Sequence, residues 1–94
     1  MKIVLAAALV TLTAGNALAA APTPEQKIAF LKACEKYGST EVCTCKADQA
    51  MKLVDSDFMK VIIDSINGKT TPVEDTQKYA VYISKSNKVC APGM

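Results

Sequence analysis

Apolar side chains recur at helical spacing along the chain from residue 23 onward. The stretch TPEQ at 23–26 offers a threonine N-cap, a proline at the first helical position and a glutamine at the third, which together form a capping box. Gly38 is expected to end the helix in the left-handed conformation. Apolar residues between these signals share one helix face at spacings of one, three and three: Phe30, Leu31, Cys34 and Tyr37. The pattern predicts a helix over 24–37.

Two further apolar stripes predict helices over 41–54 and 56–67. Ser39 or Thr40 caps the first, whose apolar face consists of Val42, Cys43, Ala47, Ala50, Met51 and Val54. Asp55 or Ser56 caps the second, and Asn67-Gly68 ends it. This second stripe is the strongest in the chain and consists of Phe58, Met59, Ile62, Ile63 and Ile66. We therefore expect the helix over 56–67 to form the heart of the core.

The stretch TPVE at 71–74 repeats the threonine, proline and acid order of a helix start and predicts a fourth helix over 72–89. Its apolar face is expected to hold Tyr79, Ala80, Ile83, Ser86 and Cys90. No segment alternates strictly between apolar and polar residues over a strand length. The fold class predicted is all-α, a small bundle of four short helices.

The first 19 residues have the pattern of a secretory signal peptide. Lys2 precedes a short apolar run from Ile3 to Leu12, and Ala17-Leu18-Ala19 fits the small-x-small rule for cleavage. A cut after Ala21 remains an alternative, which Pro22 disfavours. The apolar run is too short for a membrane span, so we expect none after cleavage. The predicted organisation is a leader over 1–19 and one mature domain over 20–94, located in the periplasm or secreted.

Charge and composition narrow the function classes. Lysine supplies all of the basic residues and the formal net charge is +2, so no arginine is present to read nucleic acid bidentately. The chain has no histidine, so it cannot form a catalytic triad that uses histidine as the base or a zinc site that uses histidine as a ligand. The carboxylates are scattered singly or lie at predicted helix starts. We therefore expect no enzyme activity, no nucleic-acid partner, no metal and no cofactor.

Four cysteines in an exported chain indicate two disulfides: Cys34, Cys43, Cys45 and Cys90. Cys43 and Cys45 lie two residues apart on a predicted helix and point about 200° apart, so we expect them to enter different bridges. The preferred pairing joins Cys43 to Cys90 and Cys34 to Cys45. The alternative joins Cys34 to Cys43 and Cys45 to Cys90. A thiol-disulfide exchange role for Cys43 and Cys45 is a further alternative, since both lie near a helix N-terminus beside Lys46.

Binding is the function class that these exclusions leave. The main expectation is a protein-binding or structural role, of the inhibitor, immunity or accessory type. The candidate contact residues are Tyr37, Tyr79 and Tyr82, and Tyr82 is placed about 100° from its helix's apolar face, where it would be directed to solvent. The alternative is a carrier of a small apolar or lipid-like ligand within the bundle. The sequence does not identify the partner protein or the oligomeric state.

Several short motifs carry a resemblance to a known group of proteins. These are Phe30-x3-Cys34, Cys43-x-Cys45, Ser56-Asp57-Phe58 at the start of an apolar helix, and a final Cys90. The pattern resembles that of small, mostly uncharacterised exported helical proteins of Gram-negative bacteria. The resemblance implies a periplasmic four-cysteine helical fold and brings no catalytic residues with it.

Overall fold

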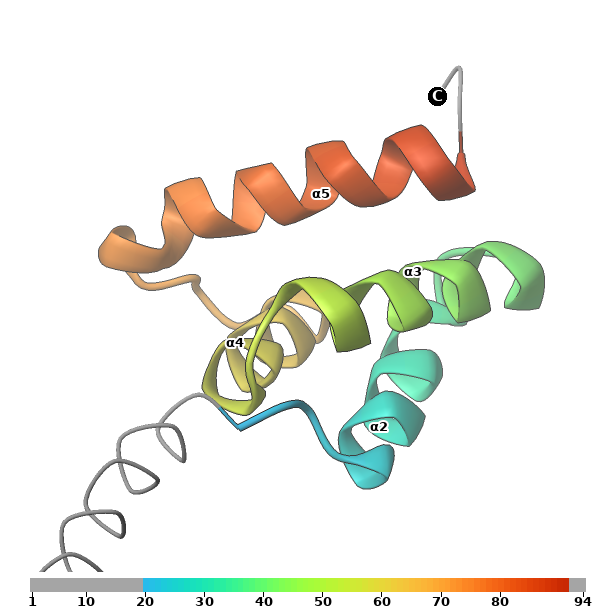
Figure 1. Ribbon diagram of the computed structural model, residues 1–94, viewed down its shortest axis with the longest axis horizontal. Helices are drawn as coiled ribbons and strands as arrows, with labels where there is room; N and C mark the ends of the chain where they lie inside the picture. Colours follow the sequence, from blue (N-terminus) through green and yellow to red (C-terminus); the bar gives the residue numbers. More distant parts are fainter. Residues whose placement is uncertain (1–19, 92–94) are drawn as a thin grey trace, which may run out of the picture.

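The computed structural model describes residues 20–91, and every regular element in that range is helical (Figure 1). The α-helices are α2 (Pro24–Cys34), α3 (Thr40–Leu53), α4 (Ser56–Ile66) and α5 (Thr76–Cys90), and the 3-10 turn η2 (Val73–Asp75) precedes α5. The predicted all-α fold with four helices is confirmed. The predicted leader over 1–19 and the last three residues of the chain lie outside the described range.

The first three helices begin at caps that local sequence predicts. The Thr23 hydroxyl accepts from the Gln26 amide at 3.1 Å, and the Gln26 side-chain oxygen accepts from the Thr23 amide at 2.9 Å, which completes the capping box of α2. Ser39 and Asp55 cap α3 and α4 through one bond each: the Ser39 hydroxyl accepts from the Val42 amide at 3.2 Å, and the Asp55 carboxylate accepts from the Phe58 amide at 2.8 Å. Both α3 and α4 begin and end within one residue of the predicted bounds, which is the usual uncertainty of a helix end.

Helix α2 ends three residues earlier than predicted. Its last residue is Cys34, whose carbonyl accepts from the amides of Tyr37 at 2.9 Å and Gly38 at 3.1 Å, so the chain leaves the helix through tight turns. Gly38 does not adopt the left-handed conformation. Among the described residues, only Gly68 has a positive φ. The prediction of Gly38 as a left-handed cap is therefore wrong, and these turns bring the chain back to the start of α3.

The predicted capping box at 71–74 is also wrong. The Thr71 hydroxyl lies 2.6 Å from the Ser65 hydroxyl on α4 and caps no helix. The chain instead makes the 3-10 turn η2, and α5 starts only at Thr76. A tertiary partner for Thr71 has replaced the local hydrogen bond that its sequence position suggests.

Helix α3 lies between the other elements. It packs against both α2 and α5, and α2 also packs against α4 (Figure 1). The starts of α2 and α4 are tied together by Gln26, which donates to the Ser56 carbonyl at 2.9 Å and accepts from the Ser56 hydroxyl at 3.1 Å. The Ser56 amide donates to the Ala20 carbonyl at 2.8 Å, so the segment before α2 is held on α4.

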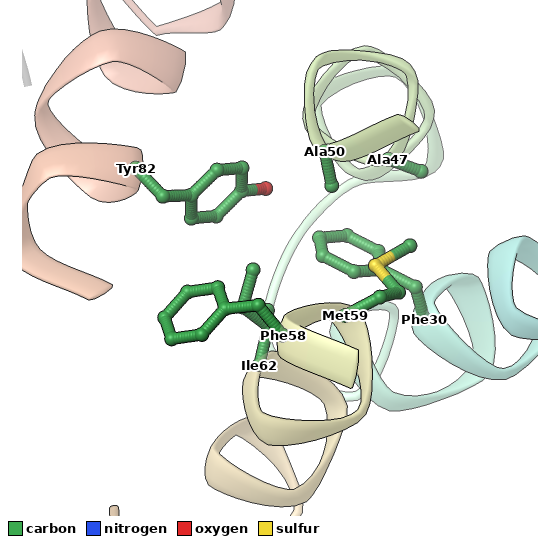
Figure 2. Packing of buried hydrophobic residues seen from close by; sticks show 7 residues of the cluster. All are labelled: Phe30, Ala47, Ala50, Phe58, Met59, Ile62 and Tyr82. Atoms are coloured by element: carbon green, nitrogen blue, oxygen red, sulfur yellow. The ribbon is translucent and has the colours of Figure 1, made fainter. Parts of the chain in front are cut away.

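The core draws side chains from all four helices, as Figure 2 shows: Phe30, Ala47, Ala50, Phe58, Met59, Ile62 and Tyr82. Helix α4 contributes three of them, which confirms the expectation that this helix forms the heart of the core. Ala47 and Ala50 present only methyl groups on α3, so side chains from α2, α4 and α5 approach it closely. Each large apolar side chain buried here stabilises the fold by about 1.5–3 kcal/mol.

The buried face of α5 agrees only in part with the predicted one. Ser86 is buried as predicted, but Tyr82 is buried as well, whereas Ala80 and Ile83, which the sequence placed on the apolar face, are exposed. Helix α5 is therefore rotated so that Tyr82 faces α3. Two contacts described below, a hydrogen bond from Tyr82 and a disulfide from Cys90, hold this rotation.

Candidate functional site

The two disulfides join Cys34 to Cys43 and Cys45 to Cys90, with Cα–Cα distances of 5.7 and 5.6 Å. The preferred pairing is therefore wrong and the alternative pairing is the one present. Cys43 and Cys45 do enter different bridges, in agreement with their angular separation on α3. The preferred pairing failed because it placed Cys45 toward the turn at Gly38, whereas Cys43 faces that turn and α2, and Cys45 faces α5.

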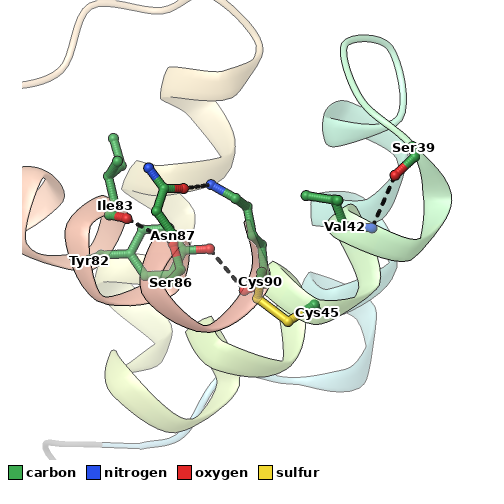
Figure 3. Close-up of a disulfide and its surroundings, with 9 residues drawn as sticks. Ser39, Val42, Cys45, Tyr82, Ile83, Ser86, Asn87 and Cys90 are labelled. Atoms are coloured by element: carbon green, nitrogen blue, oxygen red, sulfur yellow. Dashed lines mark hydrogen bonds between the residues drawn. A yellow bond between two sulfur atoms is a disulfide. The ribbon is translucent and has the colours of Figure 1, made fainter. Parts of the chain in front are cut away.

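The two bridges differ in exposure at one sulfur. Cys43 is fully buried, whereas Cys34, Cys45 and Cys90 are each partly exposed. Figure 3 shows the Cys45–Cys90 bond, which covalently joins α3 to the C-terminal end of α5. Every cysteine in the described range is disulfide-bonded, so Cys43 and Cys45 form no bridge with one another.

The three candidate contact tyrosines differ in their surroundings. Tyr37 follows α2 and is 76% exposed, whereas Tyr79 packs beside the core and burial raises its pKa. Tyr82 is only 4% exposed, so the expectation that it points into solvent is wrong. The cause is the rotation of α5, which turns Tyr82 toward α3.

A polar network beside the disulfide fixes α5 on α3 (Figure 3). The Tyr82 hydroxyl donates to the Lys46 carbonyl at 2.8 Å, and the Lys46 ammonium donates to the Asn87 side-chain oxygen. The Ser86 hydroxyl donates to the Ile83 carbonyl within α5 at 3.2 Å. Desolvation raises the pKa of Tyr82 and lowers that of Lys46. The hydrogen bonds of Tyr82 and Lys46 therefore join α5 to α3, while that of Ser86 stays within α5.

A groove of about 420 Å³ opens beside this network, where the end of α3 and the start of α4 face α5. We call it the α3–α5 groove. It is lined by Leu53, Val54, Asp55, Phe58, Glu74, Gln77, Lys78, Val81, Tyr82 and Lys85.

Aromatic side chains form the floor of the α3–α5 groove, and partly exposed aliphatic side chains form its walls. Phe58 and Tyr82 are each 4% exposed, while Leu53 on α3 and Val81 on α5 keep 40% and 45% of their surface in water. The Lys78 ammonium lies 5.0 Å from the centroid of the Phe58 ring, a cation–π contact. Apolar surface on two different helices is thus available to a bound molecule.

The apolar pattern of the sequence does not predict this groove. Leu53 and Val81 both lie outside the apolar stripes predicted for their helices. The signal present in the sequence was that each is an apolar residue directly beside a core residue, Leu53 before Val54 and Val81 before Tyr82. Only the packing of α5 on α3 brings the two together.

Residues 20–91 contain neither a metal-binding cluster nor a membrane-spanning helix. No cluster of three or more histidine, cysteine or acidic side chains has metal-binding geometry there, and no helix in that range combines the length and apolar character that crossing a bilayer requires.

Comparisons with known proteins gave no match, whether against protein-family models, curated proteins or solved structures.

Proposed function

We propose that this protein is an exported, periplasmic or secreted domain that binds another protein through the α3–α5 groove. One observation carries the proposal: Leu53 and Val81 remain partly exposed on opposite walls of a groove whose floor is the Phe58 and Tyr82 rings. Binding sites for proteins commonly centre on such apolar and aromatic groups within a polar rim. Here Glu74, Gln77, Lys78 and Lys85 supply the rim.

The compartment in the proposal rests on the disulfides and on the predicted leader. Both pairs of cysteines are bonded, which is typical of proteins in oxidising compartments such as the periplasm. A chain of this size also gains much of its stability from such bridges, so the fold suits that environment.

Capture of partners from the envelope of the producing cell tests the proposal. A photo-crosslinking residue at position 81 is expected to yield a defined adduct with one protein, because this position lies in the groove wall. The same residue at position 89 is the matched control, since Val89 is on the same helix, is 58% exposed and does not line the groove.

Substitution completes the experiment. With the crosslinking residue moved to position 53 on the opposite groove wall, Val81→Lys is expected to abolish capture while Val89→Lys leaves it unchanged, with both variants retaining the wild-type melting temperature within a few degrees. Equal capture by Val81→Lys and wild-type protein would show that the groove is not the binding site.

A carrier of a small apolar ligand is the second candidate. It is favoured by the volume of the groove, about 420 Å³, which falls in the range of roughly 300–1,000 Å³ that small-molecule sites occupy. Native mass spectrometry of the protein purified after export distinguishes the two functions. A co-purified small ligand that Val81→Lys removes would support a carrier, and ligand-free protein would count against one.

A further inference from the structure

We infer that the α3–α5 groove receives an amphipathic helix of the partner protein, with carboxylates flanking the apolar face of that helix. The inference rests on the proposed function, because it names the kind of segment that the partner would insert. It follows from the charges on the α5 wall, from the groups already engaged in the groove, and from the shape of its walls.

Two lysines and one valine make up the middle of the α5 wall. Lys78 and Lys85 are seven residues apart, so they lie about 10 Å apart along the axis and on the same side of α5. Val81 lies between them and is partly exposed. The wall therefore presents an apolar contact between two positive charges.

Both ammonium groups are available to a ligand. The ion pairs among residues 20–91 use Lys27, Lys60 and Lys69, and neither Lys78 nor Lys85 belongs to one. Lys78 is positioned over the Phe58 ring, at the edge of the apolar floor. A carboxylate entering the groove thus meets these lysines without breaking an ion pair in the described part of the chain.

The two acids of the groove leave its middle positive. The Asp55 carboxylate accepts from the Phe58 amide at 2.8 Å as the cap of α4, which engages its charge at a helix N-terminus. Glu74 belongs to η2, at the end of the wall that precedes α5. Acids on the partner therefore fit beside Lys78 and Lys85, and a basic residue fits at the Glu74 end.

The dimensions of the groove favour a helix as the occupant. The wall from Glu74 to Lys85 covers three turns, about 16 Å, and helices form both sides of the groove. A bound helix buries its apolar stripe against Leu53 and Val81 and keeps its own polar side in water, which is the helix-in-groove mode of recognition. An acyl chain lying in the same open groove would leave one side of its hydrocarbon in water.

Two synthetic peptides of about 16 residues test the inference, since this length spans the groove with a margin. Both carry the same leucine and phenylalanine face, and the flanking positions seven residues apart are glutamate in one peptide and lysine in the other. Binding to the disulfide-intact protein is followed by amide NMR shifts. The glutamate peptide is expected to bind roughly fivefold to tenfold more tightly at low salt, with a difference that shrinks as salt screens the charges.

A charge reversal in the groove supplies the specific readout. Lys78→Glu/Lys85→Glu is expected to invert the preference so that the lysine peptide binds more tightly. The control Lys32→Glu/Lys88→Glu makes the same change in net charge at two exposed lysines that do not line the groove, and it is expected to keep the preference for the glutamate peptide.

Several results would overturn the inference. Equal binding of the two peptides, binding of neither, or a preference that the groove reversal leaves unchanged would each do so. Equal binding that Val81→Lys still abolishes would refute the acidic helix but leave the groove as a protein-binding site. Shifts at Val81 and Phe58 with laurate alone, and with neither peptide, would assign the groove to an acyl ligand instead.

Discussion

Tyr82 joins the floor of the groove to the backbone of α3 through one hydrogen bond. Its hydroxyl donates to the Lys46 carbonyl at 2.8 Å while its ring packs with Phe58 and Ile62 in the core. Burial of the ring raises the pKa of the phenol, because the charged phenolate would lose its hydration. A single side chain thus contributes to the core, to the attachment of α5 and to the binding surface.

Replacing Tyr82 by phenylalanine is expected to lower the free energy of unfolding by about 1 kcal/mol near neutral pH, through loss of that hydrogen bond. Alkaline pH provides a second readout. The native phenol stays protonated above pH 10.0, where an unfolded tyrosine ionises, so its contribution is complete below that pH and declines as the pH rises further. Tyr82→Phe removes this part of the alkaline decline.

Urea unfolding of both proteins at neutral pH and at about pH 10.5 measures the effect. Tyr37→Phe is the control, since Tyr37 is exposed and its loss should change neither value. An alkaline decline of equal size in wild type and Tyr82→Phe would contradict the burial of the phenol.

The glycines that follow α2 and α4 differ in backbone conformation. Gly68 has φ of 96°, a left-handed value that residues with a side chain rarely adopt. Gly38 has no positive φ, and a Cβ built there would meet the Cys43 sulfur at 3.7 Å, an ordinary contact. Position 68 therefore favours glycine, whereas position 38 has room for a Cβ and no backbone conformation that favours glycine.

Gly68→Ala is expected to destabilise the protein by about 1 kcal/mol, because alanine is strained at a left-handed position. Gly38→Ala is expected to be neutral or to stabilise by a few tenths of a kcal/mol, since alanine restricts the unfolded chain. Thermal melts of the two variants compare them directly. If Gly38→Ala were the more destabilising, the chain at 38 would be the left-handed one.

The two threonine-proline motifs show how far helix positions are predictable. TPEQ at 23–26 and TPVE at 71–74 both place a proline after a threonine and a glutamine or glutamate three residues after it, yet only the first stretch forms a capping box. Thr23 has no competing partner, whereas Thr71 pairs with Ser65 on α4. The apolar stripes predicted the number of helices and most of their bounds. The late start of α5 accompanies the contact of Thr71 with α4, and the early end of α2 accompanies the turns at the Cys34 carbonyl.

The long disulfide holds α5 on the rest of the molecule. Cys45 and Cys90 are 45 residues apart in the chain, and Cys34 and Cys43 only nine. Since α5 packs mainly on α3, the Cys45–Cys90 bridge is its only covalent link to the other helices besides the chain leading into it. Reduction of this bridge would leave α5 held by Tyr82, Lys46 and Asn87.

In the chain-entropy view, removing the long bridge costs about 4 kcal/mol and removing the short one about 2.6 kcal/mol. Cys45→Ala/Cys90→Ala is therefore expected to lower stability more than Cys34→Ala/Cys43→Ala, as measured by urea unfolding. Because Cys43 is fully buried while Cys34, Cys45 and Cys90 are partly exposed, alkylation after limited reduction is expected to label Cys43 last. Labelling of Cys43 before the other three cysteines would contradict this order.

The candidate groove was beyond prediction because its walls come from residues about 28 positions apart in the chain, Leu53 and Val81. Helical periodicity states which residues share a face, but not how far a helix is rotated on its neighbour. The orientation of α5 follows from the Tyr82 hydrogen bond and the Cys90 bridge, neither of which has a local signal.

Local interactions along this chain were sufficient to establish an all-helical fold, the number of helices, the side-chain caps of the first three helices and the separation of Cys43 and Cys45 into two bridges. These depend on periodicity and on hydrogen bonds between residues three or four apart. The partner of each cysteine, the burial of Tyr82 and the exposure of Leu53 and Val81 depend on which face of α3 each neighbouring helix covers. Because α3 offers packing surfaces on more than one side, that choice is made by contacts between distant segments when the helices assemble.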